Sequence, residues 1–204
     1  MAFQTIGFIG LGLIGGSIAK KMKSNQPDIK IYATAHHKET IEEAYRGGLI
    51  ENNDLLPLSA FSDCDYIFLC APVQRNLAYL RQLKDIIRSD CYITDVGSTK
   101  TEIHEEVIRL GMEANFIGWH PMTGSEKTGI LSATNTLLEN AYYIITPTAL
   151  TPKEEISEFR DFVLSLGAIP LILDYKIHDY STAAISHLPH MIAYSLVNLV
   201  HQID

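Results

Sequence analysis

The sequence predicts an α/β protein, in which a doubly wound and mainly parallel sheet is followed by the start of an all-helical C-terminal domain. Strand-like and helix-like patterns alternate through the first 174 residues, which is typical of βαβ units on a parallel sheet. A glycine-rich turn separates the first strand pattern from the first helix pattern. Beyond Asp174 the strand patterns stop, and the remaining residues are apolar on most sides.

We count eight strands, and the residue patterns delimit seven of them. These are 5–10, 30–35, 64–73, 91–98, 115–121, 141–147 and 168–174. The clearest is CDYIFLCAPV (64–73), a nearly continuous apolar run of the kind found in buried parallel strands. The sheet should therefore be covered by helices on both faces.

Helical spacing of apolar residues and terminal signals place helices between the strands. The expected ranges are 13–24, 38–50, 76–88, 99–111 and 151–167. Gly47 and Gly48 stop the second helix, and acidic residues near the start of the fourth suit the helix dipole. Thr151 is the expected N-cap of the fifth, with Pro152 at its first helical position and Gly167 at its end.

We place a domain boundary near Asp174, which divides the chain into residues 1–174 and residues 175–204. The second part reads as the first helix of a helical domain that is incomplete in this chain. Its length and apolarity suit a membrane span, but His187, Pro189, His190 and Asn198 argue against one. A helix apolar all round is normally buried, so further helices or a partner subunit should cover it.

Composition narrows the functional class. The net charge of −8 at pH 7 argues against general nucleic-acid binding, which requires a basic surface. The three cysteines show neither a metal-ligand spacing nor a paired framework, so we expect a reducing, cytoplasmic environment and no metal site. The apolar N-terminus lacks a basic leading region and is rich in glycine, so we interpret it as a buried strand rather than a signal peptide.

The turn GLGLIGG (10–16) holds the spacing Gly10-x-Gly12-x-x-Gly15 between a strand and a helix. In that context it is the dinucleotide-binding fingerprint of Rossmann-type folds. Gly10 permits the tight turn, Gly12 admits the pyrophosphate, and Gly15 lets the helix pack closely on the strand. The alternative is a purely structural turn. Expected cofactor contacts are Gly10, Gly12, Leu13, Ile14, Gly15, Ala35, His36, Ala71 and Pro72.

The residue at the ribose position leaves the choice between NAD and NADP open. NAD enzymes usually place Asp or Glu about twenty residues after the glycines, on the ribose 2′-hydroxyl. Here Ala35 takes that place, which removes a carboxylate that would repel a 2′-phosphate. His36, His37 and Lys38 could supply positive charge to such a phosphate, or could form an ordinary solvated loop.

Three strand ends carry polar residues where a substrate would lie. In open α/β sheets this is beyond the carboxyl ends of the strands, where CAPV, DVGSTK and GWHPMTGSE are found. Oxidation by a nicotinamide also needs a group that accepts a proton from the substrate. His120 is the candidate, and His187 and His190 share one helix face. We expect His178 to cap the last helix and no specific role for His36, His37, His104 or His201.

Five motifs occur together in order: GLGLIGGSIA, LCAPV, TDVGSTK, GWHPMTGSEKTG and HDYSTAAISHLPH. In order and spacing they resemble the prephenate dehydrogenase family of tyrosine biosynthesis, which includes the arogenate dehydrogenases. The resemblance runs from Ile6 to about Leu199. The first motif is shared with many dehydrogenases, whereas HPMTGSEKTG and SHLPH are much more specific.

The resemblance implies the reaction. Hydride would leave the ring C4 of prephenate for NAD or NADP, the C4 hydroxyl would give up its proton, and carbon dioxide would leave as the ring becomes aromatic. The product would be 4-hydroxyphenylpyruvate, or tyrosine if the substrate is arogenate. By this resemblance His120 is catalytic, Ser98 orients it, Ser125 and Glu126 line the substrate pocket, and His187 and His190 lie over the site.

The chain departs from the family in one respect. Family members continue into a longer helical domain that supplies an arginine to the substrate and forms a homodimer, so this chain reads as a fragment. Two alternatives remain: a dinucleotide-binding module without catalysis, and a different dehydrogenase of similar architecture, such as one acting on 3-hydroxy acids. The set Ser98, His120, Ser125 and Glu126 favours an enzyme over the first, and SHLPH argues against the second.

Overall fold

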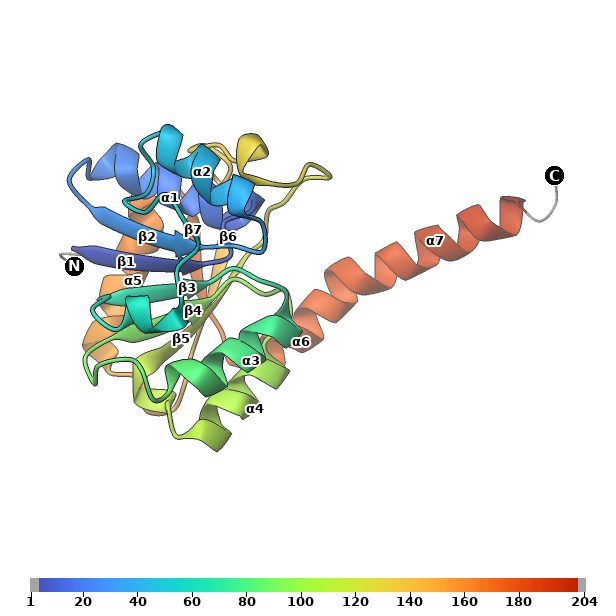
Figure 1. Ribbon diagram of the computed structural model, residues 1–204. Coiled ribbons are helices and arrows are strands. Elements are labelled where there is room, and N and C mark those ends of the chain that lie inside the picture. The colour runs from blue at the N-terminus through green and yellow to red at the C-terminus, as the bar shows by residue number, and fades with distance from the viewer. Residues whose placement is uncertain (1–3, 202–204) are drawn as a thin grey trace.

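The computed structural model describes residues 4–201, and within them it confirms the predicted fold class. Figure 1 shows a central twisted sheet with helices on both faces and one long helix that leaves the domain. The described residues form seven strands, so the expected count of eight is wrong. They are β1 (Thr5–Ile9), β2 (Lys30–Thr34), β3 (Tyr66–Leu69), β4 (Tyr92–Asp95), β5 (Phe116–Pro121), β6 (Tyr142–Pro147) and β7 (Ile169–Ile172).

The strand order across the sheet is β2-β1-β3-β4-β5-β6-β7. All neighbours pair in parallel except β5 and β6, which are antiparallel. The carboxyl ends of β1, β3, β4 and β5 therefore lie at one edge of the sheet. Ligands of open α/β sheets bind at this edge.

Five helices cover the sheet and two more extend from it. They are α1 (Leu13–Asn25), α2 (Lys38–Arg46), α3 (Val73–Leu83), α4 (Thr101–Leu110), α5 (Lys153–Ser165), α6 (Tyr175–Thr182) and α7 (Leu188–His201). Single 3-10 turns lie at Leu58–Phe61, Glu113–Asn115 and Ile130–Ser132. Buried residues of α1, α2 and α5 form one core, whereas those of α3 and α4 form a second. The helices that carry these two cores lie on opposite faces of the sheet (Figure 1).

Proline explains where two helix starts differ from expectation. The strand expected over 64–73 ends at Leu69, and α3 begins at Val73 rather than residue 76. Pro72 ends the extended run, because its carbonyl accepts the amide hydrogens of Arg75 and Asn76. Pro152, rather than Thr151, is the N-cap of α5. The Thr151 hydroxyl instead donates to the carbonyl oxygen of Phe116, at 2.9 Å.

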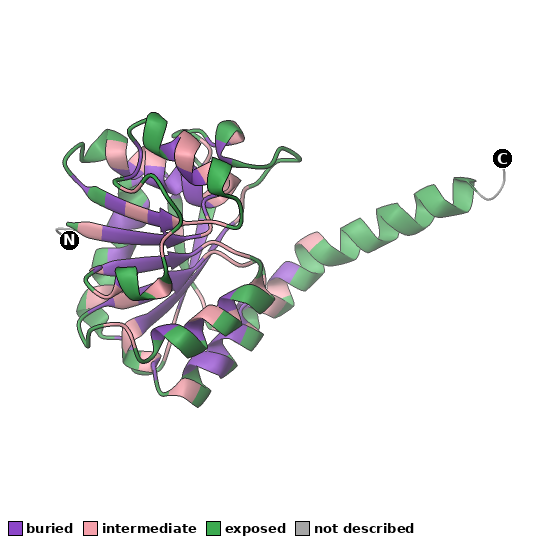
Figure 2. Cartoon of the chain, viewed as in Figure 1, coloured by how far each residue is buried: buried purple, intermediate pink, exposed green. Residues whose placement is uncertain are grey.

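The chain continues past β7 as one helical rod. α6 leads through a π-helical turn (Ala183–His187) into α7. Asp174, not His178, caps this rod, since its carboxylate accepts the amide hydrogens of Lys176 and Ile177. α7 projects away from the domain and is exposed throughout (Figure 2). Residues Tyr175–His201 are long and apolar enough to cross a membrane by length and composition alone.

Candidate active site

The glycine turn has the geometry that a bound pyrophosphate requires. Gly10 adopts φ +98°, and a β-carbon there would lie 2.7 Å from the carbonyl carbon of Cys70. At Gly15 a β-carbon would lie 2.7 Å from the carbonyl oxygen of Gly10, so the helix packs directly on the turn. Gly12, the N-cap of α1, offers no side-chain cap, and the first turn holds no acidic residue. The free amide hydrogens and the helix dipole can therefore hold an anion.

A cavity of about 380 Å³ opens next to this turn. It is lined by the glycine turn, the end of β2 with the start of α2, the loop from β3 into α3, and Gly129 in the loop after β5. Of the expected cofactor contacts, Gly10, Gly12, Ala35, His36, Ala71 and Pro72 line it. Leu13 and Ile14 are half-buried in the first turn of α1, and Gly15 is buried beneath the turn. The position of the cavity, at the carboxyl edge of the sheet, suits a dinucleotide.

Among the described residues, the lining of this cavity includes one cation, Arg75, and no carboxylate. His36, His37 and Arg75 line it together with Thr40 and Ala35. The Arg75 guanidinium lies 3.3 Å from Nδ1 of His36. Lys38, for which either a charge contact here or a solvated position was open, pairs with Asp54 at 3.2 Å and is not part of the lining. Sequence reasoning missed Arg75, whose signal was its place one helical turn after Pro72.

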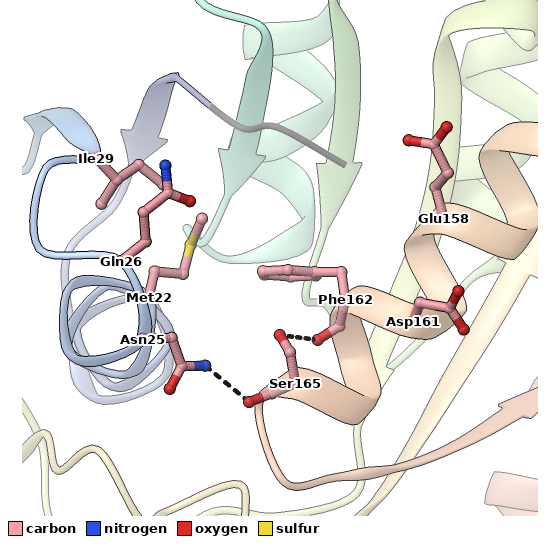
Figure 3. A pocket seen from close by; sticks show the side chains of 8 residues that line it. All are labelled: Met22, Asn25, Gln26, Ile29, Glu158, Asp161, Phe162 and Ser165. Carbon is pink, nitrogen blue, oxygen red and sulfur yellow. Dashed lines mark hydrogen bonds between the residues drawn. The ribbon is translucent and has the colours of Figure 1, made fainter.

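A second cavity, of about 200 Å³, lies between the end of α1 and α5 (Figure 3). Asn25 closes one side by donating to the Ser165 carbonyl at 2.7 Å. The carboxylates of Glu158 and Asp161 belong to its lining. It lies at the opposite end of α1 from the glycine turn, and its acidic lining disfavours phosphate. The cavity beside the glycine turn is therefore the better candidate of the two for a dinucleotide.

His120 lies near the end of β5, at the same edge of the sheet as the glycine turn, and is 9% exposed. Trp119 before it is fully buried and packs against Phe68, Tyr143 and Phe159 on the α5 face. Because side chains alternate along a strand, His120 faces the other way. There its Nδ1 lies 2.8 Å from Nε2 of His178 on α6.

His178 and Asp179 extend this contact into a chain of three side chains, which sequence reasoning missed. Nδ1 of His178 lies 2.8 Å from Oδ1 of Asp179. The carboxylate of Asp179 also accepts the backbone amides of Lys100 and Thr101, at 2.7 and 2.8 Å, and the Thr101 hydroxyl at 2.6 Å. The sequence did contain a signal for this contact. Asp174 is a better N-cap than His178, and a helix that begins after Asp174 has His178 in its interior rather than at its start.

Burial keeps His120 neutral. Desolvation, followed by the charge of Lys100 and the neighbouring His178, lowers the pKa of His120 to about 3. Desolvation also lowers the pKa of His178, although its hydrogen bond with Asp179 acts in the opposite direction. At neutral pH both rings are therefore uncharged. His120 can accept a proton or a hydrogen bond, as a general base must.

A buried ion pair lies next to the strand that carries His120. Lys100 and Asp95 are both fully buried, and Nζ of Lys100 lies 2.5 Å from Oδ2 of Asp95. The same ammonium donates to the carbonyl oxygen of Trp119 at 2.5 Å. It thereby joins the loop after β4 to the strand that carries His120.

Within residues 4–201, no hydrogen bond joins His120 to the remaining candidate residues. Ser98 is exposed in the loop between β4 and α4, and no side-chain hydrogen bond of Ser98 is found within residues 4–201. Ser125 and Glu126 are exposed in the loop after β5 and contact each other at 3.4 Å. His187 and His190 are exposed on the rod, and His187 contributes to lowering the pKa of His120.

His104 is not the surface residue we expected. It is fully buried, its Nε2 lies 2.9 Å from the Thr146 hydroxyl, and its ring stacks on Tyr175 with centroids 4.5 Å apart. It thus packs the first residue of the rod against the domain. Across residues 4–201, no three or more His, Cys, Asp or Glu side chains are grouped so that they could hold a metal ion.

Two family models match the chain. The nucleotide-binding domain of prephenate dehydrogenase matches residues 18–170, and the dimerization domain of prephenate dehydrogenase matches residues 174–204. The prephenate dehydrogenase of Lactococcus lactis subsp. cremoris is 40% identical over 193 residues, 93% of this chain and 52% of the relative. That of Bacillus subtilis is 35% identical over 200 residues, 97% of this chain and 54% of the relative. The chain thus spans about half the length of these curated relatives.

Solved structures agree. The crystal structure of prephenate dehydrogenase from A. aeolicus in complex with hydroxyphenyl propionate and NAD+ matches with a TM-score of 0.91 and 28% identity, over 100% of this chain and 71% of that one. The Synechocystis arogenate dehydrogenase matches with a TM-score of 0.85 and 34% identity, over 96% and 69%. These matches confirm the resemblance read from the motifs. The chain belongs to the prephenate dehydrogenase family.

Proposed function

We propose that this protein oxidises and decarboxylates prephenate to 4-hydroxyphenylpyruvate, in tyrosine biosynthesis in the cytoplasm. The observation that carries the proposal is a neutral, nearly buried His120 at the sheet edge that also holds the glycine turn. The two curated relatives named above are prephenate dehydrogenases, which supports prephenate as the substrate. Arogenate is the second candidate, because a relative at 34% identity is an arogenate dehydrogenase.

In the proposed reaction, the cofactor and His120 have separate roles. The nicotinamide, when bound, takes the hydride from the ring carbon that bears the hydroxyl. His120 accepts the hydroxyl proton as the hydride departs and returns it to the same oxygen as carbon dioxide leaves and the ring becomes aromatic. No proton is gained or lost overall. We assign substrate contacts to Ser98, Ser125, Glu126, His187 and His190, carried over from the family pattern.

The cofactor is a nicotinamide dinucleotide, and we propose that NADP is accepted as well as NAD. A relative's structure contains NAD+, which supports the site. The ribose end of the cavity holds Arg75 and His36 and no carboxylate, so nothing there repels a 2′-phosphate. The arrangement of Ala35 and Arg75 thus permits both cofactors.

We propose residues 1–174 as the dinucleotide-binding domain and residues 175–204 as part of the helical domain that forms a homodimer. The match of residues 174–204 to a dimerization domain supports this division. So does the apolar surface of α7, where Leu188, Met191, Ile192 and Leu196 are each more than half exposed. A second subunit would bury this surface.

A steady-state assay that crosses both substrates with both cofactors tests the function. It should compare the 204-residue chain with the product of its whole gene. Reduced nicotinamide should form in a prephenate-dependent reaction, with one carbon dioxide released for each hydride transferred. Turnover with arogenate but not with prephenate would replace prephenate by arogenate as the proposed substrate. Turnover with neither would refute the proposal.

A further inference from the structure

We propose that Asp179 and His178 are positioning residues that fix His120 in its Nδ1-protonated tautomer, so that Nε2 presents a lone pair to the substrate hydroxyl. The three side chains form one line of contacts, with 2.8 Å between His120 Nδ1 and His178 Nε2 and 2.8 Å between His178 Nδ1 and Asp179. This inference rests on the proposed function for its role in catalysis. The tautomer itself can be tested without any turnover.

Asp179 sets the direction of the line, because a carboxylate can only accept. Its two oxygens receive four hydrogens: Oδ1 from the Lys100 amide and the His178 ring, and Oδ2 from the Thr101 amide and hydroxyl. Burial alone would raise the pKa of Asp179, but these hydrogen bonds outweigh it and hold the pKa below its ordinary value. Asp179 is therefore ionised, and Nδ1 of His178 must carry a hydrogen.

A neutral imidazole has one hydrogen, so Nε2 of His178 is then an acceptor. Two groups reach it: Nδ1 of His120 at 2.8 Å and the Thr182 hydroxyl at 3.5 Å. The shorter contact is made only if His120 donates from Nδ1. Nε2 of His120 is left without a hydrogen and, in the described part of the chain, without a protein hydrogen bond.

The anchoring of Asp179 explains why this line should be rigid. α4 has no side-chain cap of its own, and the Asp179 carboxylate receives the first amides of that helix. The rod is therefore attached to the loop that carries Ser98 by the same side chain that orients His178. A histidine whose partner is held in this way keeps one ring orientation.

The direct test is ¹⁵N NMR of the histidine rings in the 204-residue chain at neutral pH. The wild type should show His120 protonated at Nδ1. His178→Phe removes the acceptor with little change in volume and should shift His120 toward a mixture of tautomers. His178→Gln supplies an amide oxygen and should restore the Nδ1 form. His104→Phe, a buried histidine that does not contact His120, is the matched control and should leave the tautomer unchanged.

The kinetic readout separates a positioning role from a structural one. His178→Phe should lower kcat at least about 10-fold with KM little changed, because a mis-set ring orientation affects the chemical step. His178→Gln should recover most of that loss. The inference is overturned if wild-type His120 is protonated at Nε2, or if His178→Phe leaves both its tautomer and kcat unchanged. If the wild type oxidises neither prephenate nor arogenate, the proposed function fails, whereas the NMR result still decides the tautomer.

Discussion

The replacement Lys100→Met tests how much the buried ion pair of Lys100 and Asp95 stabilises the fold around His120. Methionine keeps much of the side-chain volume but removes the ammonium, which lies 2.5 Å from both Asp95 Oδ2 and the Trp119 carbonyl oxygen. Asp95 would keep the amide of Gly97, at 2.8 Å, and the backbone hydrogen bond with Trp119, both of which lower its pKa but carry no compensating charge. Removing one member of a buried pair leaves an uncompensated charge, which costs about 3–5 kcal/mol of unfolding free energy.

Chemical or thermal unfolding, followed by fluorescence, measures this loss. Trp119 is the single tryptophan of the chain, is fully buried and contacts Lys100 through its carbonyl oxygen. Its fluorescence therefore reports on unfolding around the substituted residue. The expected loss corresponds to a fall in Tm of roughly 6–20 °C for a domain of this size.

The pH dependence of the loss has a definite sign. Burial already raises the pKa of Asp95, and without Lys100 the pKa should rise further. A folded-state pKa above the unfolded value favours folding at low pH and disfavours it as pH increases through the folded pKa. The gap between variant and wild type should therefore be larger at pH 8 than at pH 5.

A double-mutant cycle with Asp95→Asn supplies the control. The asparagine amide of that variant is uncharged, so removing the ammonium as well leaves no unpaired charge in the core. The double variant should therefore be less destabilised than the sum of the two single variants. A Lys100→Met protein within about 1 kcal/mol of the wild type at neutral pH would contradict the assigned role of the pair.

Two further predictions follow from the cofactor cavity and the buried histidines. Ala35→Asp should shift selectivity from NADP toward NAD, and Arg75→Gln should weaken NADP binding more than NAD binding. If the ratio of the NADP to the NAD dissociation constant is unchanged in both variants, the 2′-phosphate does not bind near Ala35 and Arg75. Acid should destabilise the fold from about pH 6.5 downward, because burial lowers the pKa values of His104 and His120 to about 3 while the unfolded chain takes up protons. Each histidine contributes up to about 1.4 kcal/mol per pH unit in that window, so His104→Phe should flatten the slope in urea titrations, and an unchanged slope would show that His104 is not buried as a neutral ring.

Local patterns were sufficient to predict much of the fold. The glycine turn, the run 64–73 and the alternation of strands and helices depend on contacts between near neighbours in sequence. Parallel strands bring their carboxyl ends to one edge, so the sequence alone was enough to place His120 and the glycine turn together. Helix starts were less accurate, because Pro72 and Pro152 act as N-caps without a side-chain hydrogen bond.

The parts of the site that could not be predicted depend on contacts across long sequence separations. His120 and His178 are 58 residues apart, and their contact forms only when the rod packs against α4. His104 stands among charged residues in TEIHEEVIRL, which conceals that it lies on the face with Val107 and is fully buried. Arg75 reaches the ribose corner because α3 begins earlier than the apolar spacing indicated.

Prephenate-dependent formation of reduced nicotinamide by the product of the whole gene, measured for the wild type and for His120→Asn, tests the central claim most directly. We expect turnover by the wild type and a kcat lower by roughly 10²–10⁴-fold in the variant, the usual range for a lost general base. The affinity for the dinucleotide alone should change little, because His120 is not part of the lining of the cofactor cavity. Wild-type turnover by His120→Asn would remove His120 from the reaction and contradict the account.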